Sequence, residues 1–214
     1  MAIDIDEALK KPVGILEDNY SFFVLPLIPA AIDLLTGSVR RPGGMLGLFF
    51  SAYGLLSFLA FLVGIWVMGG LVRMAEEQLR GGRPDYNVGL QVISERWADF
   101  TVAAVIIAVG TFVGLLLFII PGLLWLMFVA FTLPIMVVKN LDAVAAIGES
   151  INLIRENLND VFLYLLVLVV LMALVDFVLS LIPYIGGAIA TIIIDPYAAL
   201  SVTIAYHQLE GGDF

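Results

Sequence analysis

Residues 99–138 read DFTVAAVIIAVGTFVGLLLFIIPGLLWLMFVAFTLPIMVV, and no charged side chain follows Asp99 within them. A helix needs about 20 apolar residues to cross roughly 30 Å of hydrocarbon, so this stretch is long enough for two passes. Pro121-Gly122 divides it, because proline lacks the N–H that continues a helix and glycine permits a turn. The stretch predicts two membrane-spanning helices, 99–120 and 122–138, joined by a tight hairpin.

The rest of the chain has the same apolar character. Of its 214 residues, 62% are hydrophobic and 14% are charged, whereas soluble domains average about 45–50% apolar and about 25% charged residues. Backbone groups in lipid must be satisfied internally, which favours helices over open strands. The chain is therefore predicted to be a single all-α integral membrane domain, 1–214, with about six transmembrane helices. The four further apolar runs are 20–36, 46–72, 161–182 and 187–208.

Charge and composition exclude several classes of function. The net charge of −9 argues against a nucleic-acid partner, whose phosphates require Lys and Arg. The absence of cysteine excludes thiolate metal sites and cysteine nucleophiles, and a single histidine, His207, excludes a histidine-rich metal site. No HExxH, GxSxG or Walker pattern is present. We therefore expect no metal or cofactor and assign no catalytic residue, and an enzyme has no positive support.

The distribution of basic residues indicates the orientation. The connections on the side of both predicted termini carry eight of them, namely Lys10, Lys11, Arg73, Arg80, Arg83, Arg96, Lys139 and Arg155. The opposite side carries Arg40 and Arg41. Because Lys and Arg concentrate in cytoplasmic loops, we expect a multi-pass protein of the cell membrane with both termini in the cytoplasm.

Amphipathic segments precede the predicted hairpins. In 141–158, apolar residues recur at helical spacing opposite polar and charged ones, which is typical of a helix lying in the membrane interface. Weaker copies are 87–98 and the N-terminal residues. The sequence thus predicts three helical hairpins, each preceded by a cytoplasmic amphipathic interfacial helix. It also predicts a threefold repeat with units 1–80, 81–139 and 140–214.

Ionisable residues inside the predicted spans are the candidate site. Asp33, Asp176 and Asp195 are costly in hydrocarbon, so each marks a possible function. Asp176 and Asp195 lie at similar depth on either side of a tight turn and can approach each other. Thr203 and His207 follow Asp195 at multiples of four, which predicts a polar track along one helix face.

Two interpretations of these acids stay open. In the first, they form a proton, cation or substrate site in the outer half of the bundle. In the second, they are structural: Asp195 bonds to Thr191 or to backbone freed by Pro196, Asp176 bonds to its own or a neighbouring helix, and Asp33 reaches a surface arginine. His207 is then an interfacial residue.

Gly110 and Gly114 form a GxxxG pattern in the predicted span 99–120. Small residues at this spacing allow helices to approach closely. Helix packing is the first interpretation and dimerisation is the second.

Short motifs along nearly the whole chain carry a resemblance to a known group. Glu7-Ala8-Leu9 precedes the first span, Arg80-Gly81-Gly82-Arg83-Pro84 follows the second, Phe118-Ile119-Ile120-Pro121-Gly122 leads into the fourth, and Ala145–Ser150 resembles an "EAxxxS" helix with Ala at position 145. This order is similar to a broad group of uncharacterised prokaryotic polytopic membrane proteins, which includes the membrane domain fused to some glycerophosphodiester phosphodiesterases. The resemblance implies a polytopic helical fold and no catalytic residues. The 214 residues contain no phosphodiesterase domain, so that activity is not carried over.

Two functions follow from these observations. The amphipathic segments favour a membrane scaffold, assembly or lipid-interacting protein, with membrane lipids and possible membrane-protein partners or a homo-oligomer. The acids in the spans favour the alternative, a small transporter or permeation pathway.

Overall fold

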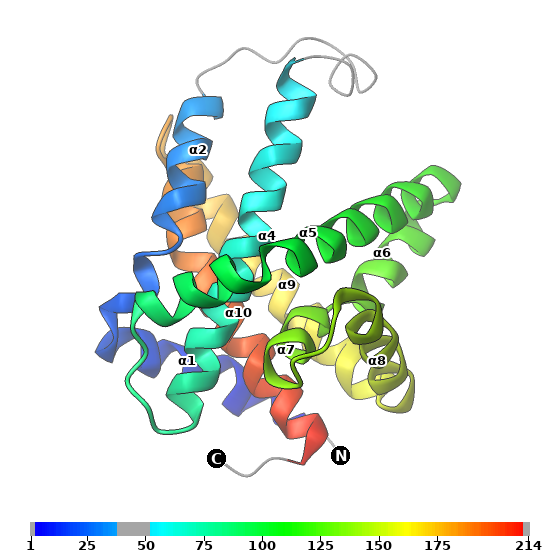
Figure 1. Cartoon of the computed structure of the whole chain (residues 1–214). Helices are drawn as coiled ribbons and strands as arrows, with labels where there is room; N and C mark the ends of the chain where they lie inside the picture. Colours follow the sequence, from blue (N-terminus) through cyan, green and yellow to red (C-terminus); the bar gives the residue numbers. More distant parts are fainter. Residues whose placement is uncertain (1–2, 38–51, 212–214) are drawn as a thin grey trace.

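The computed structural model describes residues 3–37 and 52–211, with side chains described for 3–35 and 56–211. Every regular element in these residues is helical, which confirms the all-α prediction (Figure 1). The elements are α1 (Ile5–Asp18), η1 (Tyr20–Phe23), α2 (Leu27–Gly37), α4 (Ala52–Leu79), α5 (Tyr86–Leu117), α6 (Ile119–Phe128), α7 (Thr132–Val138), α8 (Ala143–Glu156), α9 (Leu158–Ser180) and α10 (Gly186–Glu210). Helix α10 is central and contacts α1, α2, α4 and α9.

Five segments of the described chain are long and apolar enough to cross a membrane. They are Leu56–Leu79, Tyr86–Leu117, Ile119–Val138, Leu158–Ser180 and Gly186–Glu210. A sixth candidate is bent, since α1 and residues 20–35 meet at 96°. The count of five to six agrees with the predicted six. The start of the predicted span 46–72 lies outside the described residues, as do Arg40 and Arg41, and α4 continues past residue 72 to Leu79.

The hairpin between α5 and α6 turns at Phe118, so the prediction of a turn at Pro121-Gly122 was wrong. Phe118 is extended, with φ −166° and ψ 160°, and α6 begins directly after it. Pro121 lies in the first turn of α6, where N–H groups have no intrahelical partner and a missing one costs little. The proline therefore belongs to the start of the second helix and does not end the first.

The predicted span 122–138 is divided into α6 and α7. The α-helical hydrogen bonds stop at Phe128 and resume at Thr132. Ser150 of α8 bridges this break: its fully buried Oγ donates to the Phe128 carbonyl at 2.8 Å and accepts from the Phe131 N–H at 3.3 Å. A polar side chain from another helix thus satisfies backbone groups that the break exposes.

The predicted helix 87–98 corresponds to the first part of α5, which is joined directly to the following span. Asp85 caps this helix by accepting the Asn87 N–H at 3.2 Å. The side-chain amide and backbone N–H of Asn87 together hold the pKa of Asp85 below its ordinary value. The two parts of α5 meet in a kink at Arg96, whose φ of −124° and ψ of 18° are not helical.

The predicted amphipathic segment 141–158 contains α8, which packs on α5, α6 and α7. The side chains of α8 that are buried are Ala143, Ala146, Ile147, Ser150 and Ile154. Val144, placed on the apolar face by its spacing, is exposed. One side of α8 is therefore buried against other helices of the protein, and the position of α8 in a membrane interface stays a prediction. The threefold division of the chain stays a prediction.

The largest cluster of buried side chains joins α5, α7, α9 and α10. It includes Phe100, Phe131, Tyr164 and Tyr206. The Tyr164 hydroxyl is 2.8 Å from Ser201 Oγ, so this buried polar group is satisfied. Helix α5 packs on α4, whereas the tip of the α5–α6 hairpin lies away from α2 and α4 (Figure 1), and the side chains at the tip are exposed.

Candidate functional site

A groove opens between α1, η1, α9 and α10. Its volume is about 990 Å³, near the upper end of the roughly 300–1,000 Å³ found for small-molecule sites. Two of its walls are apolar: α9 supplies Leu171, Met172 and Val175, and α10 supplies Ile193 and Ile194. The groove can therefore take a large apolar group.

Helix α1 forms the third wall and is held along α10 by side-chain hydrogen bonds. The Asp4 N–H donates to Gln208 Oε1 at 3.0 Å, and Gln208 Nε2 donates to Glu7 Oε2 at 3.0 Å. Further along, the Tyr197 hydroxyl donates to the Leu9 carbonyl at 3.0 Å. These bonds position α1 beside the groove.

Pro12 and Gly14 shape α1 at this wall. Pro12 has no N–H to bond the Ala8 carbonyl, which opens the turn in which the Leu9 carbonyl accepts the Tyr197 hydroxyl. Gly14 lines the groove, and a Cβ placed on it would meet no atom within 4 Å. The groove is thus open at Gly14 because this residue has no side chain.

Charged and aromatic side chains line the α1 side of the groove. Lys10 and Glu17 are about two turns apart on one helix face. Lys10 Nζ is 2.7 Å from Asp6 Oδ2, but the two side chains are 76% and 81% exposed, so this ion pair is weak. Within the described residues the side chain of Glu17 makes no hydrogen bond or ion pair. Tyr20, which is 78% exposed, and Phe23 add aromatic rings.

The acids predicted as a site lie in two places. Thr191 Oγ1 of α10 donates to Asp33 Oδ2 of α2 at 2.8 Å, and Thr191 lies one helical turn before Asp195. Asp176 is exposed on α9, and among the described residues no hydrogen bond or ion pair joins it to Asp195. The structure therefore brings Asp33, rather than Asp176, next to Asp195.

The predicted polar track on α10 is interrupted. Thr203 is buried, and its hydroxyl donates to the Ala199 carbonyl at 2.7 Å. His207 Nε2 is 2.5 Å from Glu76 Oε2 of α4. The other carboxylate oxygen of Glu76, Oε1, is 2.5 Å from Arg80 Nε. Sequence reasoning missed Glu76, although its spacing of four from Arg80 is a signal for a helical ion pair.

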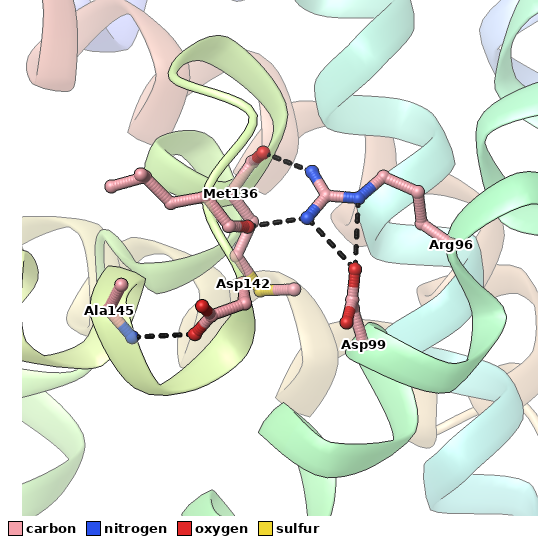
Figure 2. Close-up of polar contacts among 6 residues, drawn as sticks. Arg96, Asp99, Met136, Asp142 and Ala145 are labelled. Atoms are coloured by element: carbon pink, nitrogen blue, oxygen red, sulfur yellow. Dashed lines mark hydrogen bonds and ion pairs between the residues drawn. The ribbon is translucent and has the colours of Figure 1, made fainter.

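Arg96 joins α5 to the end of α7. Its guanidinium donates to the carbonyls of Met136 and Leu141 and to Asp99 Oδ2, which is 3.1 Å from Nη2 (Figure 2). Asp142, the residue after Leu141, caps α8: its Oδ1 accepts the Ala145 N–H at 2.9 Å. Arg96 thus provides donors for carbonyls at the point where one helix ends and the next begins.

Gly110 and Gly114 lie against α6. A Cβ at Gly110 would be 2.3 Å from Trp125 Cε2, and a Cβ at Gly114 would be 2.7 Å from Gly122 Cα. Trp125 Nε1 donates to the Ile107 carbonyl at 3.2 Å across the same contact. Both glycines of α5 therefore face α6, the other helix of the same hairpin.

These features define an all-helical protein with five to six candidate membrane spans and a lateral apolar groove. The described residues hold no group of three metal-ligating side chains. The chain belongs to the family described as a domain of unknown function (DUF7847), which matches residues 86–207. No curated protein and no solved structure matches the chain. The family match begins at α5, so α1, which forms one wall of the groove, lies before the matched residues.

Proposed function

We propose that this protein is an integral membrane protein of the cell membrane that binds a membrane lipid in the groove between α1, η1, α9 and α10. It acts as a lipid-interacting or scaffold protein. The observation that carries the proposal is the groove of about 990 Å³. Its walls combine apolar side chains on two candidate spans with charged side chains on α1.

The form of the groove supports a lipid over a water-soluble ligand. Its α9 wall belongs to a helix whose outward face is itself apolar and exposed, as expected of a surface that contacts acyl chains. The α1 wall carries Lys10 and Glu17, which require a polar environment. An occupant that contacts the apolar walls and also the charged α1 wall has a long apolar part and a polar end. A membrane lipid has this form.

Gly14→Leu tests the proposal. The new side chain fills the groove at a position where a Cβ meets no protein atom within 4 Å. Leucine is also the better helix former, since it ranks directly after alanine and glycine is about 0.8–1.0 kcal/mol less favourable than alanine, so the variant is expected to fold. We expect native mass spectrometry in mild detergent to detect bound lipid on the wild type and much less on Gly14→Leu.

Gly148→Leu is the matched control. Gly148 lies in α8, away from the groove, and a Cβ there also meets no atom within 4 Å. This variant should retain as much lipid as the wild type. Equal retention by all three proteins would contradict the proposed lipid site.

A transporter or permeation pathway is the second candidate. The observation that favours it is the group formed by Asp33, Thr191 and Asp195 across α2 and α10. If these residues carry a proton or cation, Asp195→Asn should abolish flux in liposomes, and unchanged flux would exclude this role. The resemblance to membrane domains fused to glycerophosphodiester phosphodiesterases remains part of the proposal and brings no phosphodiesterase activity to the chain.

A further inference from the structure

The apolar walls of the groove give little discrimination among lipids. Lipid tails are as apolar as leucine, so transfer of an acyl chain from the bilayer to an apolar wall has little hydrophobic driving force. Discrimination among lipids then depends on the polar end of the groove, which is formed by the charged side chains of α1. Of the residues that line it in the described chain, Lys10 and Glu17 are the charged ones.

The charge around this end is negative. Segment 4–18 has five acidic residues and two lysines, and each lysine has an acidic partner one turn away: Lys10 with Asp6 at 2.7 Å and Lys11 with Glu7 at 2.9 Å. Glu17 contributes a carboxylate without an ion pair in the described residues. Glu17 is the acidic residue of this segment that lines the groove, so an anionic headgroup would be repelled at Glu17 and a cationic group attracted.

We propose that the groove selects a zwitterionic phospholipid, with the headgroup ammonium at Glu17 and Tyr20 and the phosphate at Lys10. This inference rests on the proposed lipid-binding function. A carboxylate and an aromatic ring that line the same groove suit an ammonium group, because the ring face also attracts cations. Lys10 can exchange Asp6 for a phosphate, since their exposed ion pair is weak. The charges of the headgroup thus complement those of the groove.

The test is a competition between two lipids. The purified full chain is incubated with equal amounts of phosphatidylcholine and phosphatidylglycerol that have identical acyl chains, and native mass spectrometry gives the ratio of the two bound lipids. We expect the wild type to favour phosphatidylcholine roughly two- to fivefold, the range for one exposed charge contact. Glu17→Gln should bring the ratio near one, and Glu17→Lys should favour phosphatidylglycerol.

Asp18→Asn is the matched control, because it removes the same charge from the adjacent residue, which does not line the groove. It should keep the wild-type ratio. A loss equal to that of Glu17→Gln would mean that general surface charge sets the ratio, which overturns the inference.

Gly14→Leu separates failure of this inference from failure of the proposed function. If the wild type shows no preference or favours phosphatidylglycerol, yet binds more total lipid than Gly14→Leu, the headgroup inference is wrong and the lipid site stands. If the wild type and Gly14→Leu bind equal total lipid, both are wrong.

Discussion

At the scale of single residues, Glu76 is a buried carboxylate with a different partner for each oxygen. Arg80 contacts Oε1 and His207 contacts Oε2, each at 2.5 Å. Glu76 is fully buried, whereas the Arg80 side chain is 63% exposed. A buried carboxylate is expensive unless both oxygens have donors. His207 of α10 therefore supplies the partner for the second carboxylate oxygen of Glu76, which lies on α4.

His207→Leu should lower the free energy of unfolding by about 1–3 kcal/mol, because it leaves one buried oxygen of Glu76 without this donor. The double variant Glu76→Leu/His207→Leu should recover part of that loss, since replacing both partners with apolar groups removes the unsatisfied carboxylate. Reversible unfolding in detergent, followed by circular dichroism, measures both values. A double variant no more stable than His207→Leu alone would contradict this account.

At the scale of elements, the helices are interrupted where side chains from other helices replace backbone hydrogen bonds. Ser150 bridges α6 and α7, and Arg96 connects the kink of α5 to the carbonyls of Met136 and Leu141. Both side chains come from elements outside the interrupted α6–α7 segment. The directions of α5 and α7 thus depend on specific polar contacts as well as on apolar packing.

Arg96→Lys tests the contact between α5 and α7. A lysine ammonium has no planar fork and cannot reach both carbonyls and Asp99 with the same geometry. We expect a loss of about 1–3 kcal/mol from backbone carbonyls left without a donor, seen as a lower unfolding midpoint in detergent. Arg73→Lys is the control, because Arg73 has a single ion pair at 3.6 Å, with Glu77. Equal losses in both variants would argue against the proposed role of Arg96.

At the scale of the whole molecule, helix α10 contacts α1, α2, α4 and α9. Near the C-terminal end of α10, Lys139 Nζ contacts Glu149 at 2.7 Å and Glu210 at 3.2 Å, and these ion pairs join α7, α8 and α10. Hydrogen bonding to Glu149, and then to Glu210, raises the pKa of Lys139 above its ordinary 10.5. A raised lysine pKa stabilises the folded state below that ordinary value and ceases to do so only as pH rises through the folded pKa. These ion pairs therefore persist at neutral pH.

Tyr197→Phe should loosen α1 from the rest of the molecule. It removes the hydroxyl that donates to the Leu9 carbonyl, a bond worth about 0.5–1.5 kcal/mol. Hydrogen exchange followed by mass spectrometry should show faster exchange in residues 5–18 and unchanged exchange in α8. Unchanged exchange in 5–18 would mean that α1 is held without this bond.

The outcome of the sequence predictions differs between the fold and the site. Apolar runs predicted an all-helical fold with about six spans, and the structure has five to six candidates, because hydropathy is a property of consecutive residues. The Pro121 turn was wrong, because proline is tolerated in the first turn of a helix as well as after the last. The contact of Glu76 with His207 was missed because 131 residues separate them.

By itself, the sequence determined that this chain is helical and apolar enough for five to six membrane passes, because run length and composition are local properties. Only the tertiary structure decided where the helices bend, which charges pair and that α1, α9 and α10 enclose a groove. These features depend on contacts between residues far apart in the chain, and neither hydropathy nor helical periodicity specifies which distant side chains meet.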